Sequence, residues 1–392
     1  MSPRTGAVRR ARATAATLLI VVAAAIPAAS AHAQDPGQWV LTGASSVPLQ
    51  YWQGLTTDPA NRRIYFAGIF EGLWHTSPLL ERTAGIPRAI PAEIGSTEGY
   101  NHIGDFTWNP GEGGRLILPL ECYSPRFGNT CGTGAFGVAD PDTLAFRYYV
   151  KLDPSEIPKA MWAETSRDGT LIWTSSGRDL LAYRSADVTA ARAGPGATPI
   201  RAVRRLAGAV PPTGVTGAVF DGGRLLLAGE LRGIYQVWSV DTATGERRLV
   251  LETTLCGEAE GLDTIRTLGG ELHWLIAPLD PGCMPTYGPT SALLHYVRRP
   301  GIDGLDVRVT GASEPALPGP VEVSAEVRFR GRPIRGAAVS FAGAGAVTDS
   351  LGRATITAQL QLPGRFRVLA KGGIRYGLSD FVSLGVGPPV TP

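Results

Sequence analysis

Acidic side chains stand beside several strand-like apolar segments that are far apart in the sequence, and these acids are the residues best suited to chemistry. Together with one histidine they are Glu98, His102, Asp105, Glu164, Glu260 and Asp263. Two carboxyl groups on opposite sides of a sugar can hydrolyse a glycosidic bond, with one of them kept protonated by burial. Several carboxylate oxygens can instead hold a calcium ion. A third interpretation is that these acids are only solvated or hydrogen-bonded and have no catalytic role.

Each interpretation assigns the residues differently. If the chain is a hydrolase that acts on a carbohydrate or a lactone, the predicted catalytic acids are Asp105, Glu164 and Glu260. If a cation is bound, Ca²⁺ at the centre of the fold is the predicted cofactor. The sequence holds no G-x-S-x-G, H-E-x-x-H or P-loop motif, so it gives no support to serine-hydrolase, zinc-protease or nucleotide chemistry.

A segment between two cysteines has the features of a recognition loop. Cys122 and Cys131 enclose Tyr123, Arg126 and Phe127. A disulfide here would hold an aromatic loop rigid, which suits the recognition of a ligand. The predicted binding residues are Glu98, His102, Tyr123, Arg126, Phe127, Trp162 and Asp263.

The first 33 residues have the composition of an export signal. Four arginines and no acid accompany an apolar run, Ala15–Ala29, and Ala31 and Ala33 supply the small residues expected before a cleavage site. We expect cleavage after Ala33. The mature protein is therefore predicted to be secreted, extracellular or associated with the cell wall, and not inserted in a membrane.

Four cysteines in an exported chain fit two disulfides, for which three pairings exist. Closeness in the sequence favours Cys122–Cys131 and Cys256–Cys283. Both are predicted to be structural.

The net charge indicates which partners to expect. The whole chain has 37 basic and 34 acidic side chains, and residues 1–33 take four of the basic ones and none of the acidic ones. The remaining chain is near neutral and has no basic stripe, whereas nucleic-acid binding needs clustered Lys or Arg. Nucleic acid is excluded on this ground, and an extracellular glycan or protein is the expected partner.

A repeated pattern places the acids in a fold. Strongly apolar strands recur at spacings of 52, 55, 54 and 47 residues, aligned on Ile64, Leu116, Leu171, Leu225 and Leu272. A short strand and a turn with Asp, Asn or Gly precede each one, and a third strand and often a fourth follow. Four antiparallel strands per fifty residues indicate a β-propeller, whose innermost strands meet at one axis.

The predicted fold class is all-β, with five blades over residues 38–300 and six as the rival count. The fifth repeat lacks a fourth strand, and Gln38–Thr42 is predicted to fill its place and close the ring. An immunoglobulin-like array is the alternative, but its strands would not repeat at this period.

The Asp-Pro and Asp-Gly turns of the first hairpins, as at Asp58-Pro59 and Asp168-Gly169, resemble those of bacterial propellers of the NHL and gluconolactonase-like groups. The resemblance covers residues 38–300 and rests on a degenerate pattern. It implies the propeller architecture and no particular activity.

A smaller domain is predicted after a change of character at Arg299-Pro300-Gly301. The segments Gly331–Phe341 and Thr348–Thr357 resemble the G-x-P-I-x-G-A-x-V and T-D-x-x-G-x-A motifs of bacterial immunoglobulin-like (Ig-like) and carboxypeptidase regulatory-like sandwiches. The resemblance implies a spacer or an adhesion unit. The predicted organisation is a signal peptide over 1–33, a propeller over 34–300 and an Ig-like β-sandwich over 301–388.

The leading functional prediction is a secreted binding or scaffold protein that recognises a glycan, a ligand or a partner protein on the propeller face. The main alternative is an extracellular hydrolase of glycosidase or lactonase type that uses acids at the propeller axis. The third hypothesis is a structural module of the cell envelope. The sequence leaves the ligand and the oligomeric state open.

Overall fold

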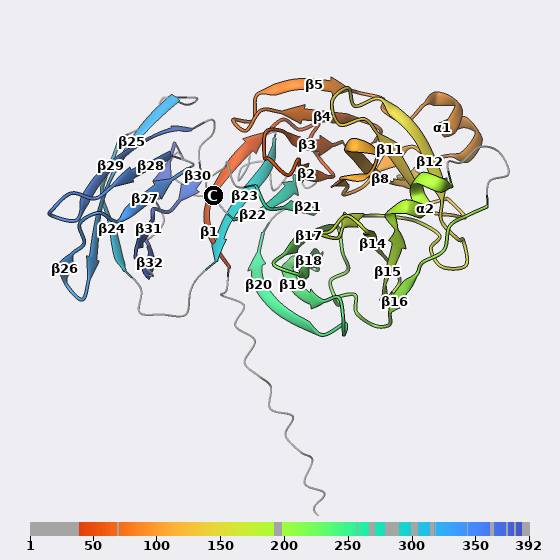
Figure 1. Ribbon diagram of the computed structural model, residues 1–392. Helices are drawn as coiled ribbons and strands as arrows, with labels where there is room; N and C mark the ends of the chain where they lie inside the picture. Colours follow the sequence, from red (N-terminus) through yellow and green to blue (C-terminus); the bar gives the residue numbers. More distant parts are fainter. Residues whose placement is uncertain are drawn as a thin grey trace, which may run out of the picture. The chain divides into compact units, whose positions relative to one another are not determined.

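Five antiparallel sheets follow one another along residues 39–298 of this computed structural model and lie around a common centre (Figure 1). The structure describes residues 39–68, 70–191, 198–255, 257–265, 271–278, 290–298, 305–313, 317, 319–342, 344–360, 364–373, 375–379 and 382–385. The predicted signal peptide and the cysteines at 256 and 283 lie outside the described residues. The described residues are all-β, as predicted, apart from two short α-helices, α1 (Ala92–Glu98) and α2 (Ser185–Ala190), and one 3-10 helical turn at Gly111–Gly113.

We number the sheets 1 to 5 in chain order. Sheet 1 contains β2 (Leu55–Thr57), β3 (Ile64–Ala67), β4 (Leu73–Thr76) and β5 (Arg82–Ile86). Sheet 2 contains β6 (His102–Ile103), β7 (Thr107–Asn109), β8 (Arg115–Glu121), β11 (Ala135–Ala139) and β12 (Phe146–Lys151). Sheet 3 contains β13 (Glu164–Thr165), β14 (Leu171–Ser176), β15 (Asp179–Arg184) and β16 (Arg204–Leu206). Sheet 4 contains β17 (Gly217–Asp221), β18 (Arg224–Leu231), β19 (Ile234–Asp241) and β20 (Arg247–Thr254).

Sheet 5, which we call the closing sheet, takes its outermost strand from the opposite end of this region. It contains β21 (Glu258–Asp263), β22 (Leu272–Ala277), β23 (Ser291–Arg298) and β1 (Trp39–Val47). β1 pairs with β23 in antiparallel register from Trp39 opposite Arg298 to Val47 opposite Ser291. The prediction that the segment before the first repeat fills the vacant fourth position is therefore confirmed, and β23 has a partner on both sides.

A separate hydrophobic cluster lies between each pair of neighbouring sheets among the described residues. The one between sheets 5 and 1 includes Leu275 and Leu293 on one side and Leu55 and Phe66 on the other. The apolar runs of the repeat are buried here because every sheet packs on both faces. Sheet 5 thus packs back on sheet 1, and the sheets form a closed ring of the β-propeller type.

The innermost strands β2, β7, β13, β17 and β21 form the centre of the ring, which we call the hub. In sequence order each contacts the next, and β21 contacts β2. All five run the same way. We call the side where they begin the upstream face and the side where they end the downstream face.

The strands after residue 305 form their own sheets. One joins β24 (Asp306–Ala312), β25 (Gly319–Phe329), β26 (Arg332–Pro333) and β29 (Arg353–Leu360). The other joins β27 (Ala338–Phe341), β28 (Ala344–Val347), β31 (Leu369–Gly372) and β32 (Arg375–Leu378). A further pair consists of β30 (Gly364–Phe366) and β33 (Val382–Leu384).

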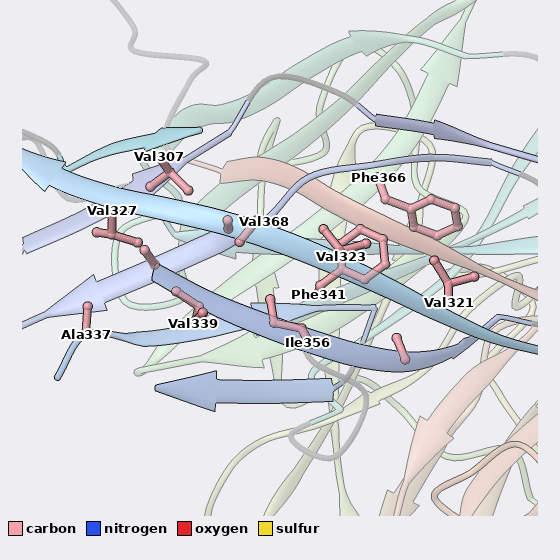
Figure 2. Close-up of a cluster of buried hydrophobic side chains, with 14 of the residues drawn as sticks. Val307, Val321, Val323, Val327, Ala337, Val339, Phe341, Ile356, Phe366 and Val368 are labelled. Atoms are coloured by element: carbon pink, nitrogen blue, oxygen red, sulfur yellow. The ribbon is translucent and has the colours of Figure 1, made fainter. Parts of the chain in front are cut away.

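One hydrophobic cluster joins these C-terminal sheets (Figure 2). Exposed and buried residues alternate along all of β29, which is the pattern of a strand with one face in a core. Ala337, Val339 and Phe341 alternate along the chain and are all buried, so they face this core. Gly331 and Gly352 have positive φ, which glycine adopts without strain at these turns.

Candidate functional site

The hub is too narrow at mid-height for most side chains. A Cβ atom at Gly261 would lie 2.5 Å from the main-chain nitrogen of Leu55 in sheet 1. Other glycines of the hub face neighbouring main chain in the same way, as Gly104 faces the carbonyl of Met161. Glycine is required where strands of different sheets approach this closely. The hub therefore separates the upstream face from the downstream face.

Asp105 lies in this narrow part and links three sheets. It follows β6, where its main chain pairs in parallel with Trp162 of the next sheet. Its Oδ1 accepts the N–H of Leu55 in sheet 1, and its Oδ2 accepts the N–H of Ala218 in sheet 4, both at 2.9 Å. The side chain is 1% exposed, and burial raises its pKa well above the usual range. Both carboxyl oxygens are thus engaged in holding the hub together.

The upstream face carries Glu260 and Glu258 at the start of β21. Gln53 donates from Nε2 to Oε1 of Glu260 at 3.0 Å. Burial raises the pKa of both glutamates, and for Glu260 the negative charges of Glu258, Asp105 and Glu121 raise it further. A buried carboxyl beside other carboxylates keeps its proton.

His102 lies at the same face and is almost fully buried. Its Nδ1 is 3.4 Å from Oε1 of Glu121, which lies opposite it on β8. The ring of Tyr123 packs on the imidazole, with centroids 5.3 Å apart. The predicted binding residue His102 is thus covered by the predicted recognition loop.

That loop is a small hairpin closed by the Cys122–Cys131 disulfide, which confirms this pairing. Its strands are β9 (Tyr123–Ser124) and β10 (Gly128–Asn129). The side-chain amide of Asn101 bonds to the main chain of Tyr123 in both directions, at 2.7 and 2.9 Å. The base is therefore fixed, while the tip presents Phe127, 68% exposed, with the Arg126 guanidinium 5.0 Å from its ring centre.

Two other predicted binding residues have partners within the fold. Glu98, the last residue of α1, forms an ion pair with Lys151 at 2.6 Å and accepts the hydroxyl of Tyr149 at 2.9 Å. The Lys151 ammonium lowers the pKa of Glu98. Trp162 is fully buried between sheets 3 and 4, where its indole N–H donates to Ser175. Its ring offers no exposed surface to a ligand.

The downstream face holds an open cleft of about 1080 Å³. All five sheets contribute to its walls, mostly through the turns that join first and second strands. The lining residues are Thr56, Thr57, Asp58, Pro59, Asn61, Thr107, Trp108, Pro110, Glu164, Thr165, Ser166, Arg167, Asp168, Val219, Phe220, Asp221, Gly222, Asp263, Thr264 and Glu271. The sequence predicted acids beside the innermost strands at the axis, and this cleft lies where those strands end. The repeated Asp-Pro, Asn-Pro and Asp-Gly turns were the signal that could have located it.

The buried acids of this cleft are Asp58, Glu164 and Asp263. Oε1 of Glu164 accepts the N–H of Phe220 at 2.9 Å. Burial raises the pKa of Glu164 to about 8, and the negative charge of Asp263 adds to the shift. Burial also raises the pKa of Asp263, to about 6, while hydrogen bonds from Thr56, Thr57 and Thr264 hold it down.

The structure thus divides the predicted acids among three levels. Glu260 and His102 lie at the upstream face, Asp105 lies in the narrow part, and Glu164 and Asp263 lie in the downstream cleft. Of the three predicted catalytic acids, Glu164 alone lines the cleft. Within the described part of the chain, no group of three or more His, Cys, Asp or Glu side chains is arranged to hold a metal ion. In that same part no helix has the length and apolar character needed to cross a membrane.

Comparisons with known proteins give a distant structural likeness. No family model matches the chain, and no curated protein sequence matches it. Among solved structures, the chain is similar to a luciferin-regenerating enzyme, with 12% sequence identity and a TM-score of 0.38. The match covers 65% of this chain and 95% of that one. The closed ring of sheets, rather than this likeness, identifies the fold as a β-propeller.

Proposed function

We propose that this chain is an exported binding protein whose propeller holds a hydroxyl-rich ligand, such as a glycan, in the downstream cleft. In this proposal residues 1–33 direct export, residues 34–300 form a five-bladed propeller, and residues 301–388 form an Ig-like spacer. The observation that carries the proposal is the convergence of polar groups from all five sheets on one cleft. Binding sites commonly combine such a concavity with a few convergent polar groups.

The chemistry of the walls suits a sugar. Hydroxyl groups of Thr57, Thr107 and Thr165 can exchange hydrogen bonds with ligand hydroxyls. Trp108 and Phe220 supply flat apolar surface, which can stack on the face of a sugar ring. The carboxyl groups add acceptors, and Arg167 adds a donor.

A second candidate is an extracellular hydrolase acting in the same cleft. Glu164 and Asp263 favour it, because two buried acids with different proton affinities are what acid–base hydrolysis needs. Asp105 fits this role less well, because main-chain N–H groups occupy both of its oxygens.

The test is glycan binding by the full chain, exported from a bacterial host and purified after processing. A glycan array would identify ligands, and calorimetry would measure affinity for the wild type, Trp108→Ala and Phe127→Ala. We expect Trp108→Ala to weaken binding at least tenfold and Phe127→Ala, at the disulfide loop, to leave it unchanged. Loss of binding in Phe127→Ala alone would move the site to the upstream face and overturn the proposal. The N-terminal residue of the product tests cleavage after Ala33.

A further inference from the structure

We propose that Glu164 and Asp263 are the general acid and the general base of a glycoside hydrolysis that takes place in the downstream cleft. This inference rests on the proposed function, since it requires that a glycan occupies the cleft. It names the reaction and assigns one role to each carboxyl group.

The two acids reach the cleft from different sheets. Glu164 lies on β13 of sheet 3 and Asp263 at the end of β21 of sheet 5, and β17 of sheet 4 lies between them in the ring. Both side chains line the cleft, although each is no more than 9% exposed. Two carboxyl groups that border one cleft from separate sheets can act on the two sides of a bond held between them.

Hydrogen bonds hold each carboxyl group in place before any ligand arrives. Glu164 accepts the N–H groups of Phe220 and Thr165 and the hydroxyl of Thr107, and these fix its direction. Asp263 accepts hydrogen bonds from the hydroxyls of Thr56 and Thr57 as well as from main-chain N–H groups. Donors of this number favour the charged carboxylate, which is the form a base needs. Glu164 has three such donors, and burial together with the negative charge of Asp263 favours its neutral acid.

The remaining charged groups around the cleft do not compete for these roles. Asp168 accepts hydrogen bonds from Ser166 and Thr170 in its turn, and these lower its pKa. Asp221 forms an ion pair with Arg298, and Asp58 accepts the N–H of Arg62. The other charged residues of the walls are Arg167 and Glu271. Asp105 lies outside the cleft, in the narrow part of the hub. The ionised carboxylate of Asp168 cannot donate a proton near neutral pH.

The reaction is balanced with water as the only co-reactant. Asp263 removes a proton from a water molecule while the water oxygen forms a bond to the anomeric carbon. The bond from that carbon to the glycosidic oxygen breaks, and Glu164 gives its proton to the departing oxygen. Glu164 ends ionised and Asp263 ends protonated, and exchange with solvent restores both.

The experiment measures hydrolysis of aryl glycosides and of the glycans that bind. Glu164→Gln and Asp263→Asn should each lower kcat by about 10²–10⁴-fold. Glu164→Gln should regain activity on a dinitrophenyl glycoside, whose leaving group needs no proton. Asp263→Ala should regain activity with azide, which replaces the activated water. The matched control is Glu156→Gln, a half-buried glutamate in the turn between β12 and β13 that lies outside the cleft and accepts hydrogen bonds from Tyr183 and Ala202. It should retain full activity.

The pH profile gives a second readout. The wild type should be most active between about pH 6 and 8, where Asp263 is ionised and Glu164 is still protonated. Glu164→Gln should lose the alkaline limb, and Asp263→Asn should lose the acidic limb. If the wild type binds glycans without hydrolysing any of them, this inference is wrong while the proposed function stands. If it binds none, the proposed function fails as well.

Discussion

The hub and the two middle strands of the closing sheet, β22 and β23, both bury ionisable side chains, but of opposite kinds. The hub buries four carboxyl groups, those of Asp105, Glu164, Glu260 and Asp263. The closing sheet buries His273 and His295, directly opposite each other on β22 and β23, with ring centroids 4.9 Å apart. Ser45 of β1 hydrogen-bonds to Nε2 of His295 at 2.8 Å, and the N–H of Ile265 donates to Nδ1 of His273.

Burial favours the neutral form in both regions, and the effect on the pKa is therefore opposite. It raises the pKa of the hub acids, whereas it lowers the pKa of His295 to about 4 and that of His273 well below its usual value. The hub is thus expected to tolerate acid and to weaken as pH rises. The closing sheet should behave in the reverse way. A buried group with a shifted pKa is a candidate for catalysis only where it borders a cleft that can admit a ligand.

The largest expected effect comes from Asp105→Ala. The substitution leaves the N–H groups of Leu55 and Ala218 buried without an acceptor, at about 1–3 kcal/mol each. We expect the free energy of unfolding to fall by about 4 kcal/mol, measured by urea denaturation. Asp179→Ala, which loses an N–H acceptor at an outer hairpin, should lower it by less than about 1 kcal/mol. Equal losses would show that Asp105 does not link the sheets.

Glu164→Gln should change the pH dependence of stability. The folded pKa of about 8 lies above the ordinary value of 4.5, so the wild-type contribution is complete below pH 4.5 and is lost as pH rises through about 8. This loss amounts to about 2.5 kcal/mol between pH 5 and pH 7. The glutamine variant cannot ionise and should lack that slope in urea denaturation at the two pH values. An unchanged slope would mean that Glu164 is ionised in the fold.

Gly261→Ala tests the close approach of strands in the hub. The new methyl group would meet main-chain and side-chain atoms of Leu55 and a carboxyl oxygen of Asp105. Overpacking of this kind costs about 1–3 kcal/mol. The matched control is Gly132→Ala, in an exposed loop with no atom within 4 Å of the new methyl group. Its midpoint of urea denaturation should stay unchanged. Comparable shifts in both variants would contradict a closely packed hub.

His295→Gln should have the smallest effect and the opposite sign of pH dependence. The folded pKa of about 4 lies below the ordinary 6.5, so stability is present above pH 6.5 and is lost as pH falls through about 4. The wild type should lose just under about 2 kcal/mol at this residue between pH 7 and pH 5, and the variant should not. Glutamine can still bond to Ser45. A variant with the same loss on acidification as the wild type would remove His295 as its source.

Much of the ring could be predicted because its signal is local. The apolar second strands are buried on both faces, so each appears in the sequence as an unbroken run, as in Leu116–Leu118. The turns before them need Asp, Asn or Gly for reasons that involve only a few residues. The place of β1 followed from counting strands, since an unpaired edge is unfavourable.

The position of each acid along the axis of the ring could not be predicted from local patterns. Asp105 bonds to residues 50 and 113 positions away, and no local pattern encodes such partners. In β21, Glu260 and Asp263 are three residues apart, and the register shifts between Ala259 and Leu262. Simple alternation therefore does not show which face each acid reaches. The sequence thus predicted which acids lie near the axis, but not which of them reach the upstream face, the narrow part or the downstream cleft.

The pairing of β1 with β23 also affects how the chain folds. Ser45 and His295 are separated by 250 positions, so synthesis yields β1 first and its partner last. The ring can close only after the whole region has emerged, and contacts over such a span form slowly. Until then β1 has no partner strand, and without β1 the strand β23 would present an open edge to other chains. A fragment that lacks β1 should consequently self-associate, even though every remaining sheet has its own strands.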